Sequence, residues 1–551
     1  MEQPEKSDPD VRREQIDRPS SGVFAAFLNG VERLGNILPH PVTLFAMFAI
    51  GVVVVSAIAS WLGWSVEDIR PGTEGQSIEV TSLATAEGLR RIAMGLVTNF
   101  TSFAPLGTVL VALLGVGVAE RAGLLSAGIR ALVLAAPQRL LTPTIVLAAV
   151  LSNTASEMGY VVLIPLAAVI YHSVGRHPFV GLAAAFAGVS GGYSANLFIG
   201  TVDPLLAGIT SEAAAIVGGD AYLAGGEKEV LATANWYFMA LSTFMITIVG
   251  TLVTELIVAP WLGEYDESEA EEGALDASKD GIAALSDEER RGLRYAVFTV
   301  IGLVGLILAL TLPEGAPFRD PNAAADATAV ERIKPLLKSV VALIFVFFLV
   351  PAWVFGRVTG TMRTDRDVID GMSKAMGSMG LYLVLVFFAA QFVAFFKWTN
   401  LGLILAVTGA DFITAMNLDG PIVFVPFILM CCFVNLMLGS ASAQWAITAP
   451  IFVPMLMTIG YTPQVIQAAY RIGDSTTNII TPMMSYFGLI LAFASRYDRK
   501  LGIGTIIATM LPYSVAFLVA WMVLFYVWVF GLGMPVGPGT ELMLPEFSGA
   551  R

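Results

Sequence analysis

The stretch GSASAQW, residues 439–445, interrupts an otherwise apolar segment, 420–460, with small and polar side chains. The stretch SNTASEM, residues 152–158, interrupts the segment 141–171 in the same way. Glycine and serine open a helix, and broken backbone at membrane depth is tolerated only where protein or a wet cavity surrounds it. We therefore interpret both segments as re-entrant helical hairpins whose tips face a common chamber.

The composition of the chain is that of a membrane protein. Of its 551 residues 56% are hydrophobic and 14% are charged, and the mean hydropathy is +0.74, whereas soluble domains carry about 25% charged residues. The formal net charge is −13, and the segment 264–289 holds eleven acidic residues against one lysine, as in a solvated linker. No basic stripe with interleaved aromatic residues is present, so nucleic acid is not an expected partner.

Nine further segments are long and apolar enough to cross the bilayer as helices. They lie near residues 44–62, 92–119, 178–210, 236–260, 293–312, 336–356, 375–396, 464–495 and 505–532. If the two hairpins dip in and return, lysine and arginine concentrate in the loops on the side of the N-terminus, which is the cytoplasmic pattern. The predicted fold is an all-α polytopic membrane protein with nine transmembrane helices and two re-entrant helical hairpins.

The two hairpins belong to an internal repeat. Each is followed by a span that begins with proline, Pro178 or Pro463, and each of those spans carries a second break, GGYSAN at 191–196 and GDSTTN at 473–478. The first hairpin should enter from the cytoplasmic side and the second from the other side, so the halves are inverted repeats. Matched breaks in inverted halves indicate a transporter's binding site; the alternative is a set of kinks that serve packing alone.

The boundaries of the parts follow from these segments. We expect a disordered cytoplasmic tail at 1–22, a first repeat at 23–263 with its hairpin at 141–171, an acidic cytoplasmic linker at 264–291, a second repeat at 292–533 with its hairpin at 420–460, and a periplasmic tail at 534–551. Residues 1–21 lack an apolar h-region, so no cleavable signal peptide is expected and the N-terminus should stay inside.

Four ionisable side chains inside the apolar segments need a physical reason, because each costs at least about 2.5 kcal/mol to insert. Arg471 and Asp474 lie three residues apart on one predicted helix and can pair. Either the pair only fixes helix packing, or Arg471 binds a substrate carboxylate while Asp474 holds a coupling cation or proton. Asp203, before Pro204, is either a helix-cap residue or a protonatable group in the coupling path. Glu157, in the first tip, is either exposed to water or an ion ligand.

Neutral residues in the breaks extend the candidate site. Trp445 lies beside Ser440 and Ser442, so its ring could form a wall for a flat aromatic ligand, although tryptophans are also common at membrane interfaces. Three asparagines offer amide oxygens, Asn196, Asn435 and Asn478. With helix-end carbonyls they could complete a sodium site, or they could simply hold helices together.

Other energy sources and chemistries find no support. The sequence contains no Gly-Lys dipeptide, and none of its three histidines is followed by glutamate, which excludes a usual P-loop and an HExxH zinc site. Energy must therefore come from an ion gradient or from downhill flow. A secondary transporter is the favoured class. An ion channel with a filter framed by the hairpins, and a membrane-embedded enzyme, are the alternatives.

Three stretches together resemble a known family. SANLFIGTVDP at 194–204, GSASAQW at 439–445 and YRIGDSTTN at 470–478 are similar to motifs of the AbgT family of p-aminobenzoyl-glutamate transporters. The resemblance covers residues 23 to 533, and the last of the three motifs is the most specific. It implies nine spanning helices and two re-entrant hairpins in a homodimer of the bacterial inner membrane. Some members import p-aminobenzoyl-glutamate, and others are proposed to export sulfonamide antimetabolites.

The resemblance also assigns roles to residues. Trp445 would face the aromatic ring, Arg471 the anionic end of the ligand, and Asp474 the coupling ion. The expected substrate-binding residues are Trp445, Arg471, Ser440, Ser442, Pro463 and Asn435, and the expected ion-coupling residues are Asp474, Asp203, Asn478 and Asn196. A sodium ion at Asp474, Asn478 and Asn435 is the only bound cofactor considered. The sequence thus predicts a secondary transporter, not an enzyme, for aryl amides or sulfonamides, driven by protons or sodium.

Overall fold

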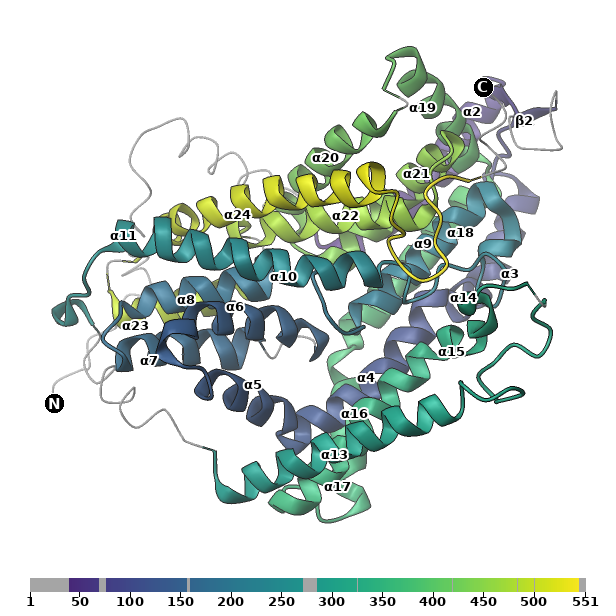
Figure 1. Ribbon diagram of the computed structural model, residues 1–551. Coiled ribbons are helices and arrows are strands. Elements are labelled where there is room, and N and C mark those ends of the chain that lie inside the picture. The colour runs from purple at the N-terminus through teal and green to yellow at the C-terminus, as the bar shows by residue number, and fades with distance from the viewer. Residues whose placement is uncertain are drawn as a thin grey trace, which may run out of the picture.

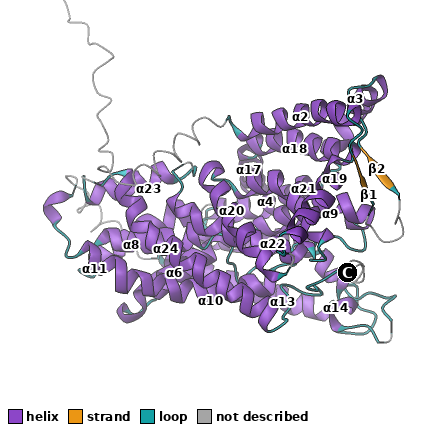
Figure 2. Cartoon of the chain, turned by 90° about the horizontal axis from the view of Figure 1, so that it is seen from above, coloured by secondary structure: helices purple, strands orange, loops and turns teal. Residues whose placement is uncertain are grey.

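The computed structural model describes residues 39–68, 76–155, 159–270, 285–324, 326–418, 420–482, 484–499 and 501–544 (Figure 1). The predicted N-terminal tail, the centre of the acidic linker, the last residues of the C-terminal tail and Glu157 lie outside the described residues. Within these ranges the chain is built from helices and one small sheet (Figure 2). The sheet pairs β1 (Ser65–Glu67) antiparallel with β2 (Ser77–Glu79), with Val66 opposite Ile78.

The membrane-crossing helices agree with the predicted number of spans. Eight helices of the described part are long and apolar enough to cross a bilayer. They are α2 (Pro41–Trp61), the continuous pair α3 (Ala86–Thr101) and α4 (Ala104–Ala122), α10 (Trp236–Val253), α13 (Asp287–Ala309), α16 (Val340–Thr359), α18 (Gly380–Trp398), α20 (Phe424–Leu438) and α24 (Ile503–Phe525). Because α20 is a hairpin limb, seven are continuous spans. The predicted spans at 178–210 and 464–495 are broken helices, and they complete the nine.

Both predicted hairpins are present as pairs of interrupted helices. The first consists of α6 (Leu141–Ser152), the 3-10 turn η2 (Asn153–Ala155), the π-helical turn η3 (Gly159–Leu163) and α7 (Ile164–Ser173). The second consists of η8 (Pro421–Val423), α20 and α21 (Ala441–Thr458), with the break at Gly439 and Ser440. Gly439 has φ +55°, a left-handed conformation that a residue without Cβ adopts at little cost.

The two spans that follow the hairpins are broken near their middles. The first comprises α8 (Pro178–Phe186), the π-helical turn η4 (Ala187–Gly191), an irregular stretch and α9 (Val202–Gly218). The second comprises α22 (Pro463–Thr477), the 3-10 turn η9 (Asn478–Ile480) and α23 (Phe487–Tyr497). Both begin with proline at the first helical position, where its missing N–H would have no intrahelical partner in any case.

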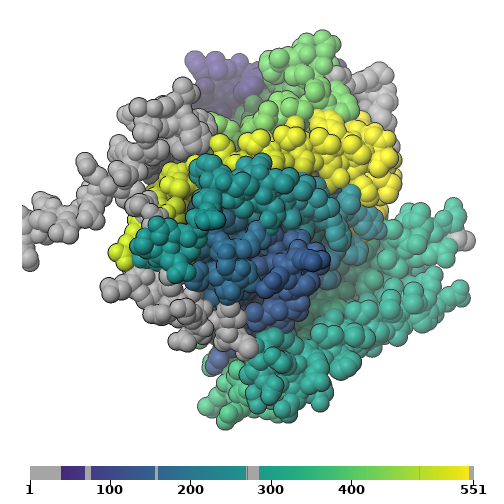
Figure 3. All heavy atoms as spheres, turned by 60° about the vertical axis from the view of Figure 1, so that its left-hand side comes forward, coloured from purple at the N-terminus to yellow at the C-terminus, as the bar shows by residue number. Residues whose placement is uncertain are grey.

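The order and packing of the elements repeat with inverted orientation. The sequence of α2, α3–α4, α5 (Leu124–Leu134), hairpin, α8–α9 and α10 recurs as α16, α17 (Asp365–Ser378) with α18, α19 (Leu401–Ala415), hairpin, α22–α23 and α24. The halves cross-pack reciprocally, since α2 lies against α18 and α16 lies against α4. Figures 1 and 2 place α8 and α23 at one end of the molecule and α9, α19 and α21 at the other. In Figure 3, α10 and α24 lie side by side across one face.

Three details differ from the expected boundaries. The helix α19 falls in a stretch to which no element was assigned, because its 15 residues are too short for a crossing. Its counterpart α5 meets the first hairpin at a bend of 114°. Helix α13 begins at Asp287, inside the expected linker, with a capping box of Ser286 and Glu289. Short helices complete the described chain: η1 (Gln138–Leu140), η5 (Gly219–Tyr222), η6 (Thr254–Val258), α11 (Ala259–Leu262), η7 (Glu267–Glu269), α14 (Ala329–Arg332), α15 (Lys334–Lys338) and η10 (Tyr526–Gly531).

Candidate functional site

The centre of the molecule is organised around the polar helix α22. From Pro463 to Asn478 almost every residue of this helix is buried, including Arg471, Asp474 and Ser475. Helices α9, α20, α21 and α24 pack around it. Its burial depends on close approach to α20, because a Cβ on Gly473 would lie 2.7 Å from the carbonyl oxygen of Ile428. The sequence therefore places a helix of low hydrophobicity where protein, not lipid, surrounds it.

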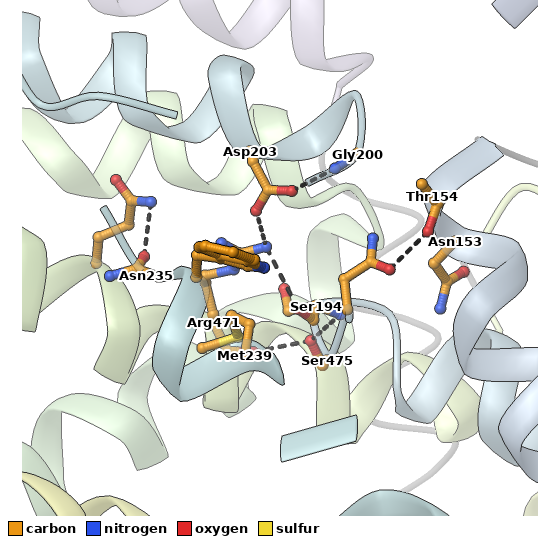
Figure 4. A network of polar contacts seen from close by, with 12 residues as sticks. Asn153, Thr154, Ser194, Gly200, Asp203, Asn235, Met239, Arg471 and Ser475 are labelled. Carbon is orange, nitrogen blue, oxygen red and sulfur yellow. Dashed lines mark hydrogen bonds and ion pairs between the residues drawn. The ribbon is translucent and has the colours of Figure 1, made fainter. Parts of the chain in front are cut away.

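Arg471 forms its ion pair with Asp203 of the other repeat. Its Nη2 lies 2.7 Å from Oδ1 of Asp203 and also donates to the carbonyl oxygen of Ser194 at 3.3 Å (Figure 4). The second oxygen of Asp203 accepts a hydrogen bond from the backbone N–H of Gly200 at 2.7 Å. Asp203 lies in the first turn of α9, where a helix N-terminus favours negative charge. Arg471 and Asp474, which their spacing allows to pair, are therefore not the ion pair of this structure, because the broken first-repeat span brings the carboxylate of Asp203 to Arg471.

Asp474 is fully buried, and its carboxylate has no hydrogen-bond partner among the described residues. The hydroxyl of Tyr470 lies in its vicinity, but that hydroxyl donates to the carbonyl oxygen of Ala441 at 2.6 Å. Arg471, one turn earlier on the same helix, already pairs with Asp203. A buried carboxylate without a partner is expensive in a membrane interior, so this position needs a proton or a cation.

The asparagines of the two hairpins make equivalent contacts in the two repeats. Asn435 donates from Nδ2 to the carbonyl oxygen of Asp474 at 2.6 Å, and Asn153 donates from Nδ2 to the carbonyl oxygen of Gly192 at 3.3 Å. Donor and acceptor are 39 residues apart in both cases. In each asparagine Oδ1 is buried with no partner among the described residues. The repeat therefore matches Gly192 with Asp474, and only the second half carries the charge.

Trp445 is buried completely and makes contacts that fix the second hairpin. Its ring stacks on Tyr470 with centroids 4.1 Å apart, and its Nε1 donates to Oγ1 of Thr210 in α9 at 2.8 Å. Thr210 in turn donates to Gln467 at 2.6 Å. Thus α21, α22 and α9 are joined by one polar chain. Trp445 does not line the cavity that lies between the two hairpins.

The remaining predicted residues separate into two groups. Ser440, Ser442 and Asn478 line a cavity of about 250 Å³ between the two hairpins. Asn196 accepts a hydrogen bond from Thr154 at 2.7 Å and so ties the first tip to the first broken span. Pro463, by contrast, is the first residue of α22 and is buried.

Sequence reasoning missed several residues that belong to the site. Asn153 and the tyrosines Tyr160, Tyr382 and Tyr486 line the same cavity. Thr210 and Gln467 join the helices around Trp445. A signal existed for Asn153, because its spacing to Gly192 equals the spacing of Asn435 to Asp474. No comparable signal pointed to the tyrosines, which come from three different elements.

The oxygen atoms around Asp474 fit a small hard cation. Both carboxylate oxygens and Oδ1 of Asn435 are buried and have no partner among the described residues. Asn478 is held close by, since its Oδ1 accepts from Nδ2 of Asn435 at 2.9 Å. Sodium sites in transporters are built from such oxygens at broken helices. No group of three or more His, Cys, Asp or Glu suited to a metal occurs among the described residues, so a transition-metal centre finds no support there.

Two inverted hairpins, two broken spans and a buried, charged centre are the features of a helical membrane transporter. The comparisons with known proteins give the family. The model of the "AbgT putative transporter family" matches residues 26–544. The p-aminobenzoyl-glutamate transport protein of Escherichia coli (strain K12) is 36% identical over 521 residues, which is 95% of this chain and 98% of that protein. The chain belongs to the AbgT family.

Solved structures agree with this assignment. MtrF of Neisseria gonorrhoeae, described as illuminating a class of antimetabolite efflux pumps, is 54% identical with a TM-score of 0.85 and covers 94% of this chain and 100% of its own. The YdaH transporter of Alcanivorax borkumensis, described as having an unusual topology, is 42% identical with a TM-score of 0.82 and covers 91% of this chain and 100% of its own. This chain is similar to both along nearly its whole length.

Proposed function

We propose that this chain is an inner-membrane secondary transporter of p-aminobenzoyl-glutamate and related aryl amides, that it exports sulfonamide antimetabolites, and that an ion gradient drives it. The name of the Escherichia coli relative supports the first substrate, and the description of MtrF supports antimetabolite export. The distribution of basic residues supports a cytoplasmic N-terminus and a periplasmic C-terminus. A homodimer is part of the proposal on the ground of the family resemblance.

The observation that carries the proposal is the buried carboxylate of Asp474, which has no hydrogen-bond partner in the described part of the chain and lies one turn from Arg471 on a buried, broken helix. A site that served packing alone would leave no buried charge without a partner, because such a charge destabilises the fold. A coupling proton or sodium ion would neutralise Asp474. If the ion is sodium, the oxygens of Asp474, Asn435 and Asn478 would hold it, and the ion would supply only charge compensation.

Arg471 offers a binding mode for an anionic substrate. In this conformation its Nη2 pairs with Asp203, whereas its Nε is buried and has no partner among the described residues. A substrate carboxylate could take up Nε and replace Asp203, because the guanidinium fork binds carboxylates in a bidentate manner. Release of Asp203 would then loosen the link between the two repeats at the moment of binding, which is a direct route to coupling.

The test is flux in proteoliposomes. Purified protein is reconstituted, and movement of labelled p-aminobenzoyl-glutamate is measured under a sodium gradient alone and a proton gradient alone, with the membrane potential clamped. Asp474→Asn is compared with Asp411→Asn, a control at an exposed position of α19. One gradient should drive accumulation in the wild type and in D411N, and D474N should lose that response. Equal responses in both variants, or single-channel currents in planar bilayers, would contradict the proposal.

A further inference from the structure

The described residues that line the cavity between the hairpins carry no formal charge. The cavity has a volume of about 250 Å³, and both tips contribute to it, through Asn153 on the first hairpin and Ser440 on the second. Within the part of the chain that the structure describes, no lining residue is acidic or basic, and neither Arg471 nor Asp203 lines the cavity. Thr201 and Val202, which do line it, directly precede Asp203. The cavity therefore lies beside the ion pair but is chemically distinct from it.

Tyrosine rings form one wall of this cavity. Tyr160, which follows the first tip, stacks on Tyr486, which lies between η9 and α23 in the second broken span, with ring centroids 4.6 Å apart and planes 8° apart. Tyr382 of α18 also lines the cavity, and its hydroxyl is already used, because it donates to the carbonyl oxygen of Pro105 at 3.1 Å. These rings, and not the buried Trp445, offer aromatic surface to a ligand in this conformation.

A buried acceptor lies in the wall of the same cavity. Asn153 lines it and is 3% exposed. Its Nδ2 is committed to the carbonyl oxygen of Gly192, whereas its Oδ1 has no partner among the described residues. A carbonyl oxygen only accepts, so a ligand that satisfies it must bring an N–H or O–H group. An unsatisfied buried acceptor is costly, so a ligand with such a donor is favoured over one without it.

We propose that this cavity is the subsite for the neutral aryl end of the substrate, an aminophenyl ring, with the stacked Tyr160 and Tyr486 as its aromatic wall and Oδ1 of Asn153 as the acceptor for the ring amine. The inference rests on the proposed function and deepens it. The volume lies just below the roughly 300 Å³ at which drug-sized pockets begin, so the cavity suits a substituted ring and not a whole acylated amino acid. The carboxylates of the substrate would then bind Arg471.

The test measures equilibrium binding to the purified, intact protein with three probes: p-aminobenzoyl-glutamate, benzoyl-glutamate, which lacks the amine, and sulfanilamide, which lacks the carboxylates. Tyr160→Leu should weaken all three by roughly five- to tenfold, because each carries the ring. Tyr486→Leu removes the other ring of the same stack and should give the same loss. It replaces Y160L as the test if Y160L does not fold. Tyr237→Leu, on an exposed residue of α10, is the control and should bind as the wild type does.

The amine and the carboxylates are separated by the choice of probe. Asn153→Ala should weaken p-aminobenzoyl-glutamate and sulfanilamide by roughly tenfold, while benzoyl-glutamate changes by less than about twofold. Arg471→Ala should weaken the binding of p-aminobenzoyl-glutamate and of benzoyl-glutamate, and it should leave the binding of sulfanilamide unchanged. Wild-type binding that persists in Y160L and Y486L, or an equal loss of all probes in N153A, overturns the subsite alone. Absence of wild-type binding to p-aminobenzoyl-glutamate and sulfanilamide overturns the proposed function and the subsite together.

Discussion

The ion pair between Arg471 and Asp203 joins the two repeats, and its energy can be measured. Its side chains are 2% and 8% exposed, and the charged atoms lie 2.7 Å apart. Removing one partner of such a pair destabilises a protein by about 3–5 kcal/mol, because the other charge remains buried and unpaired. Arg471→Met should show the full loss, since Asp203 and Asp474 are then both left without a cation. Asp203→Asn should cost less, because Arg471 can still turn toward Asp474.

The double variant D203N/R471M decides whether this reasoning holds. Since neither member of the pair is then left charged, its loss should be about 2–3 kcal/mol smaller than the sum of the single losses. The assay is unfolding of the purified protein in mixed micelles with rising dodecyl sulfate, followed by tryptophan fluorescence.

The matched control is the exposed pair of Lys397 and Asp220, whose side chains are 37% and 88% exposed. Its single variants should change the free energy of unfolding by less than about 1 kcal/mol. Additive losses at Arg471 and Asp203, or single losses no larger than those of the control pair, would refute the account of the pair.

Three further predictions concern packing, charge and capping. Gly473→Ala should destabilise the protein by about 1–3 kcal/mol, because the new methyl group meets backbone of α20. The control Gly488→Ala, which has open space around it, should leave the stability unchanged. Unfolding in mixed micelles compares the two variants, and equal stability of both would contradict the close packing of α22 on α20. Asp474→Asn should stabilise the ligand-free protein in sodium-free buffer at pH 8, because it removes a buried charge that has no partner among the described residues. An unchanged midpoint of unfolding would count against a charged, unpaired Asp474. Backbone N–H groups of Thr364 and Arg363 hold the pKa of Asp367 below its usual 3.8. The cap that Asp367 adds to α17 is therefore present above pH 3.8 and is lost as the pH falls through the lowered pKa. D367N should raise the rate of amide hydrogen exchange at residues 363–367 at pH 6, and protection equal to that of the wild type would exclude the cap.

The architecture was readable from sequence because its signals are local. Apolar length gave the spans, and the matched breaks at 152–158 and 439–445 gave the hairpins and their inverted relation. Helix α19 was missed because 15 apolar residues fit neither a crossing nor a linker. The two broken spans, 178–210 and 464–495, follow from the repetition of their breaks in both halves, and not from either segment alone.

The partners within the site were less predictable, because they depend on which helix faces meet. Arg471 and Asp474 share a helix and so invite pairing, yet the fold supplies Asp203 from 268 positions earlier in the chain at 2.7 Å. Trp445 looked like a ligand wall because it lies beside polar residues, but α9 and α22 enclose it. Asn153 was within reach of sequence reasoning, since the 39-residue spacing recurs in both halves.

The central claim is that Asp474 is the coupling group of a transport site shared by the two repeats. The most direct measurement is the initial rate of labelled p-aminobenzoyl-glutamate movement in proteoliposomes, taken for D474N and D411N under whichever ion gradient drives the wild type. We expect D411N to transport at the wild-type rate, and D474N to transport at the same initial rate with and without the gradient. A gradient response in D474N equal to that of D411N would show that coupling resides elsewhere.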